Sequence, residues 1–328
     1  MRILVLGGTV FAGRHFVELA LGRGHIITLF NRGRTGPGLF SEAERIVGER
    51  AGSLEALRGR RFDAVLDTSG YFPADVERSA QLLSPAAGRY LFVSSRSVYA
   101  DHSAPGADET SPLGELPAGA PTDEITGESY GPLKVACERA AQAAFPGRTV
   151  ILRPGLIVGP NDPTGRFTYW PQRVADGGDV LAPAPPEQPL QVIDGRDLAA
   201  FALHLLERET EGTFDVVSPD GMLTFTGMID ACLEASGSDA RIVWVDERFL
   251  LDRGVEPWTE LPLWTPGEDM AGFQRSDVSR ALAAGLVVRP IAHTVAATLR
   301  WAAAADPDRG PAMSRAREAE LLAEWRGA

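Results

Sequence analysis

A tyrosine and a lysine four residues apart, Tyr130 and Lys134, are the pair in this chain whose types and spacing best suggest chemistry. Lys134 is the one lysine among the 32 lysine and arginine residues of the 328-residue sequence. In a helix, positions i and i+4 share a face, so the ammonium is expected near the phenol. A nearby cation lowers a tyrosine pKa and suits the phenol to general acid/base work. The alternative is a surface lysine beside a buried tyrosine.

A glycine-rich turn near the N-terminus could hold the phosphates of a dinucleotide. A short strand-like run, Arg2 to Leu6, leads into Gly7-Gly8-Thr9-Val10-Phe11-Ala12-Gly13, and a helical pattern follows from Arg14 to Leu21. Glycines let the backbone approach a pyrophosphate, and the helix N-terminus attracts its charge. Strand, turn and helix in this order are the context that supports such a motif.

The end of the second predicted strand, His25 to Phe30, bears on the choice of cofactor. Asn31-Arg32-Gly33-Arg34 follows this strand, where NAD-specific enzymes usually place an acid that binds the ribose. Arginine at this place suits a 2′-phosphate, so the sequence favours NADP, with NAD as the alternative. The other interpretation is that Arg32 and Arg34 are ordinary exposed arginines.

The elements that must position these residues alternate along the chain. Further strands are predicted at 45–47, 64–66, 90–93 and 149–152, with helices near 53–57, 74–83 and 130–144. This alternation predicts an α/β fold, a Rossmann-type doubly wound parallel sheet with helices on both faces. Small polar clusters, Asp67-Thr68-Ser69-Gly70 and Ser94-Ser95, end two of the strands. Since ligands bind at the carboxyl ends of such strands, one site is predicted at that edge.

A change of pattern along the chain predicts two domains. Residues 1–160 are expected to form an NAD(P)-binding Rossmann domain, to which 187–216 return. Residues 161–186 and 217–328 are expected to form a smaller α/β substrate-binding domain with a C-terminal helix at Ser314–Trp325. Residues 101–128, rich in proline, glycine and acidic residues, predict a long surface loop. A lid over the site and a solvated insertion without a role both remain open for this loop.

Composition narrows the classes of partner. The net charge of −12 argues against nucleic acid as the main partner, because phosphate binding needs a basic surface. Two cysteines are too few for a disulfide scaffold, and five scattered histidines predict no metal site. No apolar run resembles a signal peptide or reaches the ~18 residues of a membrane span. A cytoplasmic protein with a small-molecule substrate and no membrane contact is expected.

Taken together, these motifs resemble the short-chain dehydrogenase/reductase superfamily, in the extended or atypical branch of NAD(P)-dependent epimerase/dehydratase-like reductases. The resemblance spans most of residues 1 to about 215, and its motifs lie at 7–13, 67–70, 94–99, 130–134, 153–160 and 192–197. It implies a homodimer and a catalytic centre of Ser95, Tyr130 and Lys134. In that centre Tyr130 exchanges a proton with the substrate and Ser95 binds the reacting oxygen. Lys134 would hold the nicotinamide ribose and lower the Tyr130 pKa.

The predicted binding residues form two sets. The cofactor set is Gly7, Thr9, Val10, Phe11, Gly13, Asn31, Arg32, Arg34, Glu49, Arg50, Asp67, Ser69, Gly70, Ser94, Tyr130, Lys134, Pro154 and Ile157. The substrate set is Tyr71, Arg96, Ser97, Arg166, Tyr169, Trp170 and Arg173. For the last four residues, simple packing of an aromatic segment on the second domain is the alternative.

Three departures from the family's pattern narrow the reaction. Val10 replaces the middle glycine of GxxGxxG, which implies a slightly different pyrophosphate turn, and Asn31 replaces the acid after strand two. Arg96-Ser97 stands where the family's dehydratases carry Asp-Glu, so sugar-nucleotide dehydration is not expected. Carbonyl reduction, alcohol oxidation or epimerisation remains. The substrate would be a small carbonyl or hydroxyl compound, with a sugar nucleotide and a secondary-metabolite intermediate both open.

Two alternatives belong to another functional class. The Gly-Gly-Thr opening and Asn31-Arg32-Gly33 also resemble the atypical branch that includes chloroplast stem-loop-binding proteins. An RNA-binding protein on the same fold is therefore one alternative, and an NADP sensor without turnover is the other. The acidic balance and the intact Ser95, Tyr130 and Lys134 set favour the oxidoreductase.

Overall fold

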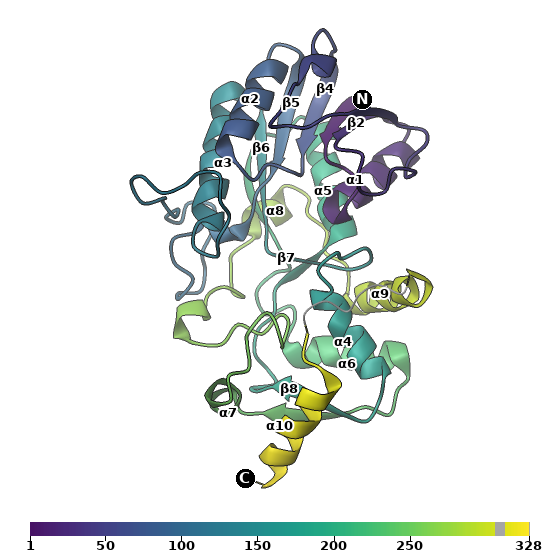
Figure 1. The fold of residues 1–328 in the computed structure, drawn as a ribbon, viewed down its shortest axis with the longest axis vertical. Helices are drawn as coiled ribbons and strands as arrows, with labels where there is room; N and C mark the ends of the chain where they lie inside the picture. The colour runs from purple at the N-terminus through teal and green to yellow at the C-terminus, as the bar shows by residue number, and fades with distance from the viewer. Residues whose placement is uncertain (306–311, 328) are drawn as a thin grey trace.

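A parallel sheet organises the first part of the chain in the computed structural model, which describes residues 1–305 and 312–327. Within those residues the sheet has seven strands in the order β10-β6-β5-β4-β1-β2-β3, and every pairing is parallel. The strands are β1 (Arg2–Leu6), β2 (Ile26–Asn31), β3 (Glu44–Val47), β4 (Phe62–Asp67), β5 (Ala87–Val93), β6 (Thr149–Pro154) and β10 (Gly212–Val216). The predicted Rossmann-type fold is confirmed (Figure 1).

Helices cover both faces of this sheet because successive strand residues point to opposite sides. Ile3 and Val5 pack in a core with α1 (Phe11–Gly22) and α5 (Gly195–Glu207). Leu4 and Leu6 pack in a second core with α2 (Pro73–Leu83) and α3 (Tyr130–Ala144). Pro132 lies in the first turn of α3, where its missing N–H costs no helical hydrogen bond. The helix that carries Tyr130 and Lys134 therefore begins where the sequence predicts.

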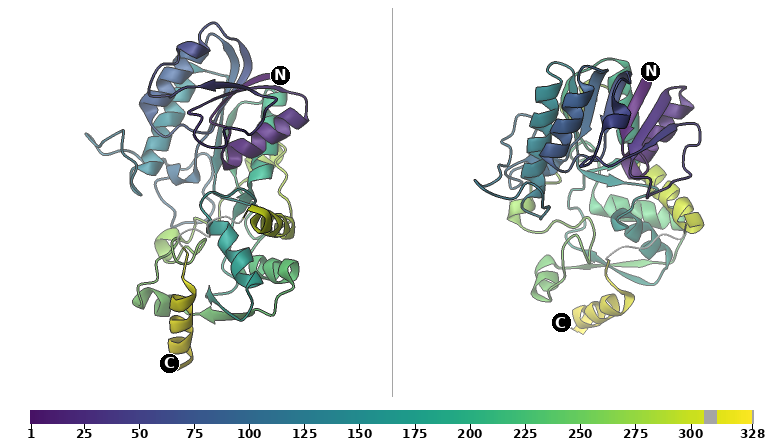
Figure 2. Two further views of the ribbon diagram at one scale, coloured as in Figure 1. Left: turned by 45° about the vertical axis from the view of Figure 1, so that its right-hand side comes forward. Right: turned by 45° about the horizontal axis from the view of Figure 1, so that its top comes forward.

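The C-terminal part has a hydrophobic core of its own, beside the carboxyl edge of the sheet (Figures 1 and 2). Its strands pair as β7 (Leu156–Val158) with β9 (Val192–Asp194), and β8 (Asp179–Pro183) with β11 (Arg241–Val245). Its helices are α4 (Arg166–Ala175), α6 (Phe225–Ser236), α7 (Glu247–Asp252), α9 (Ile291–Ala305) and α10 (Arg315–Gly327), while α8 (Ser279–Ala283) packs against β10 in the core of the large sheet. The predicted C-terminal helix is confirmed as α10. The predicted domain boundaries stay a prediction, and residues 306–311 and 328 of that call lie outside the described residues.

The loop at 101–128 contains neither helix nor strand, as predicted, but much of it is tied down. The Gly272 N–H donates to the His102 carbonyl at 2.7 Å, and the Gly106 N–H donates to the Arg275 carbonyl at 2.7 Å. The Asp277 N–H donates to the Ala107 carbonyl at 3.0 Å. These bonds fasten the beginning of the loop to the C-terminal part, while its middle projects beside α3 (Figure 1). No helix among residues 1–305 and 312–327 is long and apolar enough to cross a membrane.

Candidate active site

The glycine turn between β1 and α1 forms a tight cradle at the edge of the sheet. Gly7 has φ 103°, and a Cβ there would lie 2.6 Å from Thr68 Oγ1, so only glycine fits. At Gly13 a Cβ would lie 2.9 Å from Gly8 Cα, which shows how closely α1 approaches the turn. The residue before α1, Val10, is 44% exposed and forms no side-chain cap. The first N–H groups of α1 are thus left without a side-chain partner, as an anion site requires.

The end of β2 presents two unpaired cations beside this cradle. The Asn31 side chain is hydrogen-bonded to the backbone on both sides. Its Nδ2 donates to the Gly7 carbonyl at 2.9 Å, and its Oδ1 accepts from the Gly33 N–H at 3.0 Å. Arg32 and Arg34 are exposed, and within the described part of the chain neither forms an ion pair or a side-chain hydrogen bond. They are available to a ligand, and Glu49 is exposed as well.

Arg50 and Asp67, both predicted to bind the cofactor, form a buried network instead. The Arg50 guanidinium donates to both Asp67 oxygens at 2.7 and 2.5 Å, and the Tyr90 hydroxyl donates to Asp67 at 2.7 Å. Burial alone would raise the Asp67 pKa, but the charge and hydrogen bonds of Arg50 outweigh it and hold that pKa below its usual value. The hydrogen-bonding groups of Arg50 and Asp67 are thus already paired. These two side chains hold the loop after β3 against β4.

Tyr130 and Ser95 both lie near the carboxyl edge of β5. Tyr130 begins α3, and Ser95 directly follows the strand-end residue Ser94. Burial raises the pKa of Tyr130, and a hydrogen bond with the Ser95 side chain partly opposes that rise. The Ser95 hydroxyl also donates to Ser97 Oγ at 3.1 Å and accepts from the Ser97 N–H at 3.1 Å. The phenol is therefore held protonated at neutral pH, with a serine hydroxyl beside it.

Lys134 lies at the same edge, and its ammonium is bonded to carbonyls at and just after the ends of two strands. It is 4% exposed, and its Nζ donates to the carbonyls of Gly70 and Val93, each at 2.8 Å. The ammonium also lies 4.2 Å from the centroid of the Phe92 ring. Burial lowers the pKa of Lys134 to about 8. The prediction that Lys134 lowers the Tyr130 pKa is wrong. The ammonium donates to carbonyls at the strand ends, and burial is the largest influence on the Tyr130 pKa, which it raises.

The start of α3 is held against the Ser95 loop by a glycine. A Cβ on Gly131 would lie 1.9 Å from the Ser97 carbonyl oxygen. Gly131→Ala must therefore push α3 away from this loop and separate Tyr130 from Ser95. We expect a loss of about 1–3 kcal/mol in the free energy of unfolding, typical of overpacking, measured by urea denaturation.

The matched control for this change is Gly127→Ala, since a Cβ at Gly127 has no neighbour within 4 Å. Equal stability of the two variants would contradict the close packing at Gly131.

A cavity of about 410 Å³ opens beside Tyr130, between the sheet edge and the C-terminal part. Tyr130 is one of the residues on its wall. Its lining residues are Ser97, Tyr99, His102, Gly114, Glu115, Gly127, Glu128, Tyr130, Gly131, Pro132, Trp258, Met270 and Phe273. Of the predicted substrate set only Ser97 lines it. The sequence predicted the loop before α3, but it held no signal that Trp258, Met270 and Phe273 of the C-terminal part would line a cavity together with that loop.

Four predicted substrate residues are structural. Trp170 is fully buried, and its Nε1 donates to the Pro262 carbonyl at 2.7 Å. Arg173 is buried in an ion pair with Glu318 of α10 at 2.8 Å, and Tyr169 packs in the same core. Arg96 is buried too, and it donates to the Phe273 carbonyl at 2.7 Å. The structure corrects these four assignments, because core packing leaves the side chains no route to a ligand.

Two further predicted residues stay at the surface. Arg166 is exposed at the start of α4, outside the cavity lining. Tyr71 is 46% exposed, and the Lys134 ammonium lies 5.5 Å from the centroid of its ring. Tyr71 thus flanks the edge that carries Lys134.

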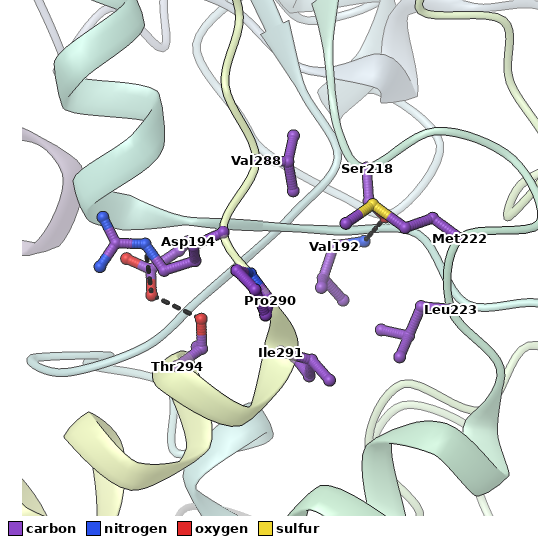
Figure 3. A pocket seen from close by; sticks show the side chains of 10 residues that line it. Val192, Asp194, Ser218, Met222, Leu223, Val288, Pro290, Ile291 and Thr294 are labelled. Carbon is purple, nitrogen blue, oxygen red and sulfur yellow. Dashed lines mark hydrogen bonds and ion pairs between the residues drawn. The ribbon is translucent and has the colours of Figure 1, made fainter.

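A second, smaller cavity of about 230 Å³ lies where β9 meets α9, and it shares no lining residue with the first. Figure 3 shows apolar side chains of this cavity, among them Val192, Leu223 and Ile291. Asp194 at its edge accepts from the Thr294 hydroxyl at 2.8 Å and pairs with Arg196 at 2.6 Å. Because its acid is fully paired, this cavity offers no free acid or base.

The parallel sheet, the glycine cradle and the edge that holds Ser95 and Tyr130 define a dinucleotide-binding protein of the short-chain dehydrogenase/reductase type. The chain belongs to the NAD dependent epimerase/dehydratase family, whose model matches residues 3–217. This membership confirms the predicted class.

Among curated proteins, the chain is similar to the chloroplast stem-loop binding protein of 41 kDa b from Arabidopsis thaliana. The two are 26% identical over 255 residues, which cover 72% of this chain and 63% of that protein, less than two thirds of its length.

Solved structures of low sequence identity share the fold. The Bordetella bronchiseptica enzyme WbmH in complex with NAD+ is 18% identical, with a TM-score of 0.67 over 92% of this chain and 98% of that one. A UDP-glucuronic acid 4-epimerase from Bacillus cereus in complex with NAD is 15% identical, with a TM-score of 0.64 over 93% and 99% of the two chains.

Proposed function

We propose that this chain is an NAD(P)-dependent oxidoreductase that transfers hydride to or from a small carbonyl or hydroxyl compound. The observation that carries the proposal is the position of Tyr130 on the wall of the 410 Å³ cavity, where the start of α3 packs closely against the loop that carries Ser95. A phenol with a raised pKa is a proton donor, so Tyr130 would protonate the carbonyl oxygen as it is reduced. The Ser95 hydroxyl would donate a hydrogen bond to the same oxygen. The bound cofactor would supply the hydride.

Several observations support a place for the cofactor along this edge. The Gly7–Gly13 cradle and the uncapped start of α1, with Thr9 and Phe11, would hold the pyrophosphate. An ammonium has three donors and Lys134 uses two on Gly70 and Val93, so one N–H is left for a ribose hydroxyl. The Ser94 hydroxyl is buried and has no hydrogen-bond partner among the described residues. Ser69, Pro154 and Ile157, at or after the ends of β4 and β6, complete the proposed set.

A deuterium label tests the reaction type. We expect 4-deuterated NADPH and a panel of ketones and aldehydes to give alcohols that carry the label. Epimerisation is the alternative, in which the hydride returns to the same substrate and no cofactor is consumed. Products without label and without net NADPH oxidation, together with inversion of a sugar carbon, would favour epimerisation.

Arg32 and Arg34 favour NADP over NAD, although the two solved structures named above hold NAD. A charge-assisted hydrogen bond to a 2′-phosphate contributes about 1.5–3 kcal/mol, so Arg32→Ala should weaken NADPH binding about 10- to 100-fold. NADH binding should change little. Nicotinamide fluorescence titration measures both.

Arg61→Ala, an exposed arginine on β4's entry loop, is the control and should leave both affinities unchanged. Tighter binding of NADH than NADPH by the wild-type protein would refute the NADP preference.

RNA binding is the second candidate, favoured by the similarity to a protein named for stem-loop binding. The net charge of −12 opposes it, because RNA affinity depends on phosphate contacts. A salt-dependent shift of stem-loop RNA on native gels, with no nicotinamide turnover, would support this candidate. A homodimer and a cytoplasmic location stay proposals from the sequence.

A further inference from the structure

The charges around the cavity at Tyr130 identify the class of substrate, on the basis of the function proposed above. None of the described residues that line this cavity is an arginine or lysine. Two of them, Glu115 and Glu128, are exposed carboxylates with no ion pair or side-chain hydrogen bond in residues 1–305 and 312–327. A phosphate group placed here would face two negative charges and no lining cation.

The nearest candidate for an opposing cation is sequestered. Arg96 stacks on the Phe273 ring with its Cζ 5.4 Å from the ring centroid, and it is 1% exposed. Its Nη1 donates to the Phe273 carbonyl at 2.7 Å, and its Nε lies 3.8 Å from Asp215 Oδ2. Phe273, and not Arg96, lines the cavity. A ligand in the cavity therefore meets the ring, with the guanidinium held beside a carboxylate in the interior.

Aromatic rings supply the rest of the wall. Trp258 and Phe273 lie 5.5 Å apart between centroids, and His102 meets the same Phe273 edge-on at 5.1 Å. Trp258 has φ 65°, an uncommon backbone conformation for a bulky residue, and such strain concentrates at functional sites. Ring faces attract an ammonium group, and carboxylates strengthen that attraction. Burial lowers the pKa of His102, which keeps its ring neutral and adds no cation.

We propose that the substrate is a small ring compound that carries no phosphate and bears a protonated amine. Its ring would lie among Tyr99, Trp258 and Phe273, with its carbonyl or hydroxyl at Tyr130 and its amine toward Glu115 and Glu128. On this assignment a compound whose phosphate must lie inside this cavity is a poor substrate, because no lining residue is a cation.

Three probes of one shape test the assignment: 4-aminocyclohexanone, 4-hydroxycyclohexanone and 4-oxocyclohexyl phosphate. Their binding is measured by calorimetry with the full-length protein, with and without NADP+, which cannot reduce a ketone. The amine should bind most tightly and the phosphate least. Glu115→Gln and Glu128→Gln should each reduce the preference for amine over hydroxyl about two- to fivefold, the range of an exposed ion pair. Glu124→Gln, an exposed acid of the same loop outside the cavity, should leave it unchanged.

Two kinds of failure are distinguishable in this design. Binding in the order amine, hydroxyl, phosphate without any NADPH oxidation would support the substrate class and overturn the proposed reaction. Tightest binding of the phosphate, binding of none of the three, or an amine preference that both glutamine variants retain would overturn the substrate class.

Discussion

Tyr130→Phe is expected to lower kcat for carbonyl reduction by about 10²–10⁴-fold, the usual contribution of a positioned general acid. The change removes one oxygen and leaves the ring to pack at the start of α3. Since burial raises the Tyr130 pKa above the ordinary value of about 10, the acid stays protonated across the neutral range. Ionisation of Tyr130 should therefore lower the rate of reduction only above about pH 10, and a fall that begins near pH 8 would instead follow the loss of the Lys134 proton.

Steady-state NADPH oxidation, with a fluorescence titration for cofactor affinity, separates chemistry from binding in this variant. Tyr71→Phe is the control, because that phenol flanks the same edge but is 46% exposed. We expect the Tyr71 variant to stay within a few-fold of wild type. A Tyr130 variant that stays there too would exclude Tyr130 as the proton donor.

Asp67→Asn is expected to lower the free energy of unfolding by about 3–5 kcal/mol, the effect of leaving a buried charge unpaired. Arg50 loses its two charged contacts at 2.7 and 2.5 Å, while the shape of the side chain hardly changes. The Asp67 pKa is depressed in the folded state. Its contribution is therefore present above the unfolded pKa of about 3.9 and is lost as pH falls through the folded value.

Urea denaturation at neutral pH and in acid measures both effects. The variant should be far less stable than wild type at pH 7, and the difference should shrink in strong acid. Asp63→Asn, an exposed position on the same strand, should change stability by less than about 1 kcal/mol. If Asp67→Asn matched that control, the buried pair would contribute no net stability.

Local pattern was enough to predict the sheet and the helix of the candidate site. Residues 2–22 read as strand, glycine turn and helix because a short run of apolar residues leads into the glycines of 7–13, and a helical pattern follows them. Tyr130 and Lys134 share a helix whose first turn accepts Pro132. These features depend on neighbours in the chain, which a sequence displays directly.

Long-range partners could not be read in the same way. Lys134 donates to carbonyls of residues 70 and 93, and Arg50 pairs with Asp67, through contacts that only the folded sheet creates. A lysine at i+4 from a tyrosine looks the same in sequence whether it tunes the phenol or ties two strand ends together. The role of Lys134 therefore depends on the direction of its side chain, which the sequence does not show.

Helix α4 shows a second limit. Arg166–Ala175 follows the 153–160 motif, where the family resemblance implies substrate binding, but it forms a helix with Pro171 inside it. Its apolar face is satisfied only by packing against the core of the C-terminal part, where Trp170 meets Phe225 at 5.0 Å between ring centroids. Tertiary packing overrides local propensity at such a place.

The single lysine has a practical consequence for anyone who studies this molecule. An amine-acylating reagent has one side-chain target in the whole sequence, Lys134, and that target is 4% exposed. Burial lowers the pKa of Lys134, and that lowering is lost when the side chain reaches solvent, so the exposed amine reacts as an ordinary lysine. The rate of acetylation of Lys134, followed by mass spectrometry of its peptide, therefore reports how often this edge of the sheet opens to solvent. Ligands that bind at this edge and keep Lys134 buried should therefore slow its acylation.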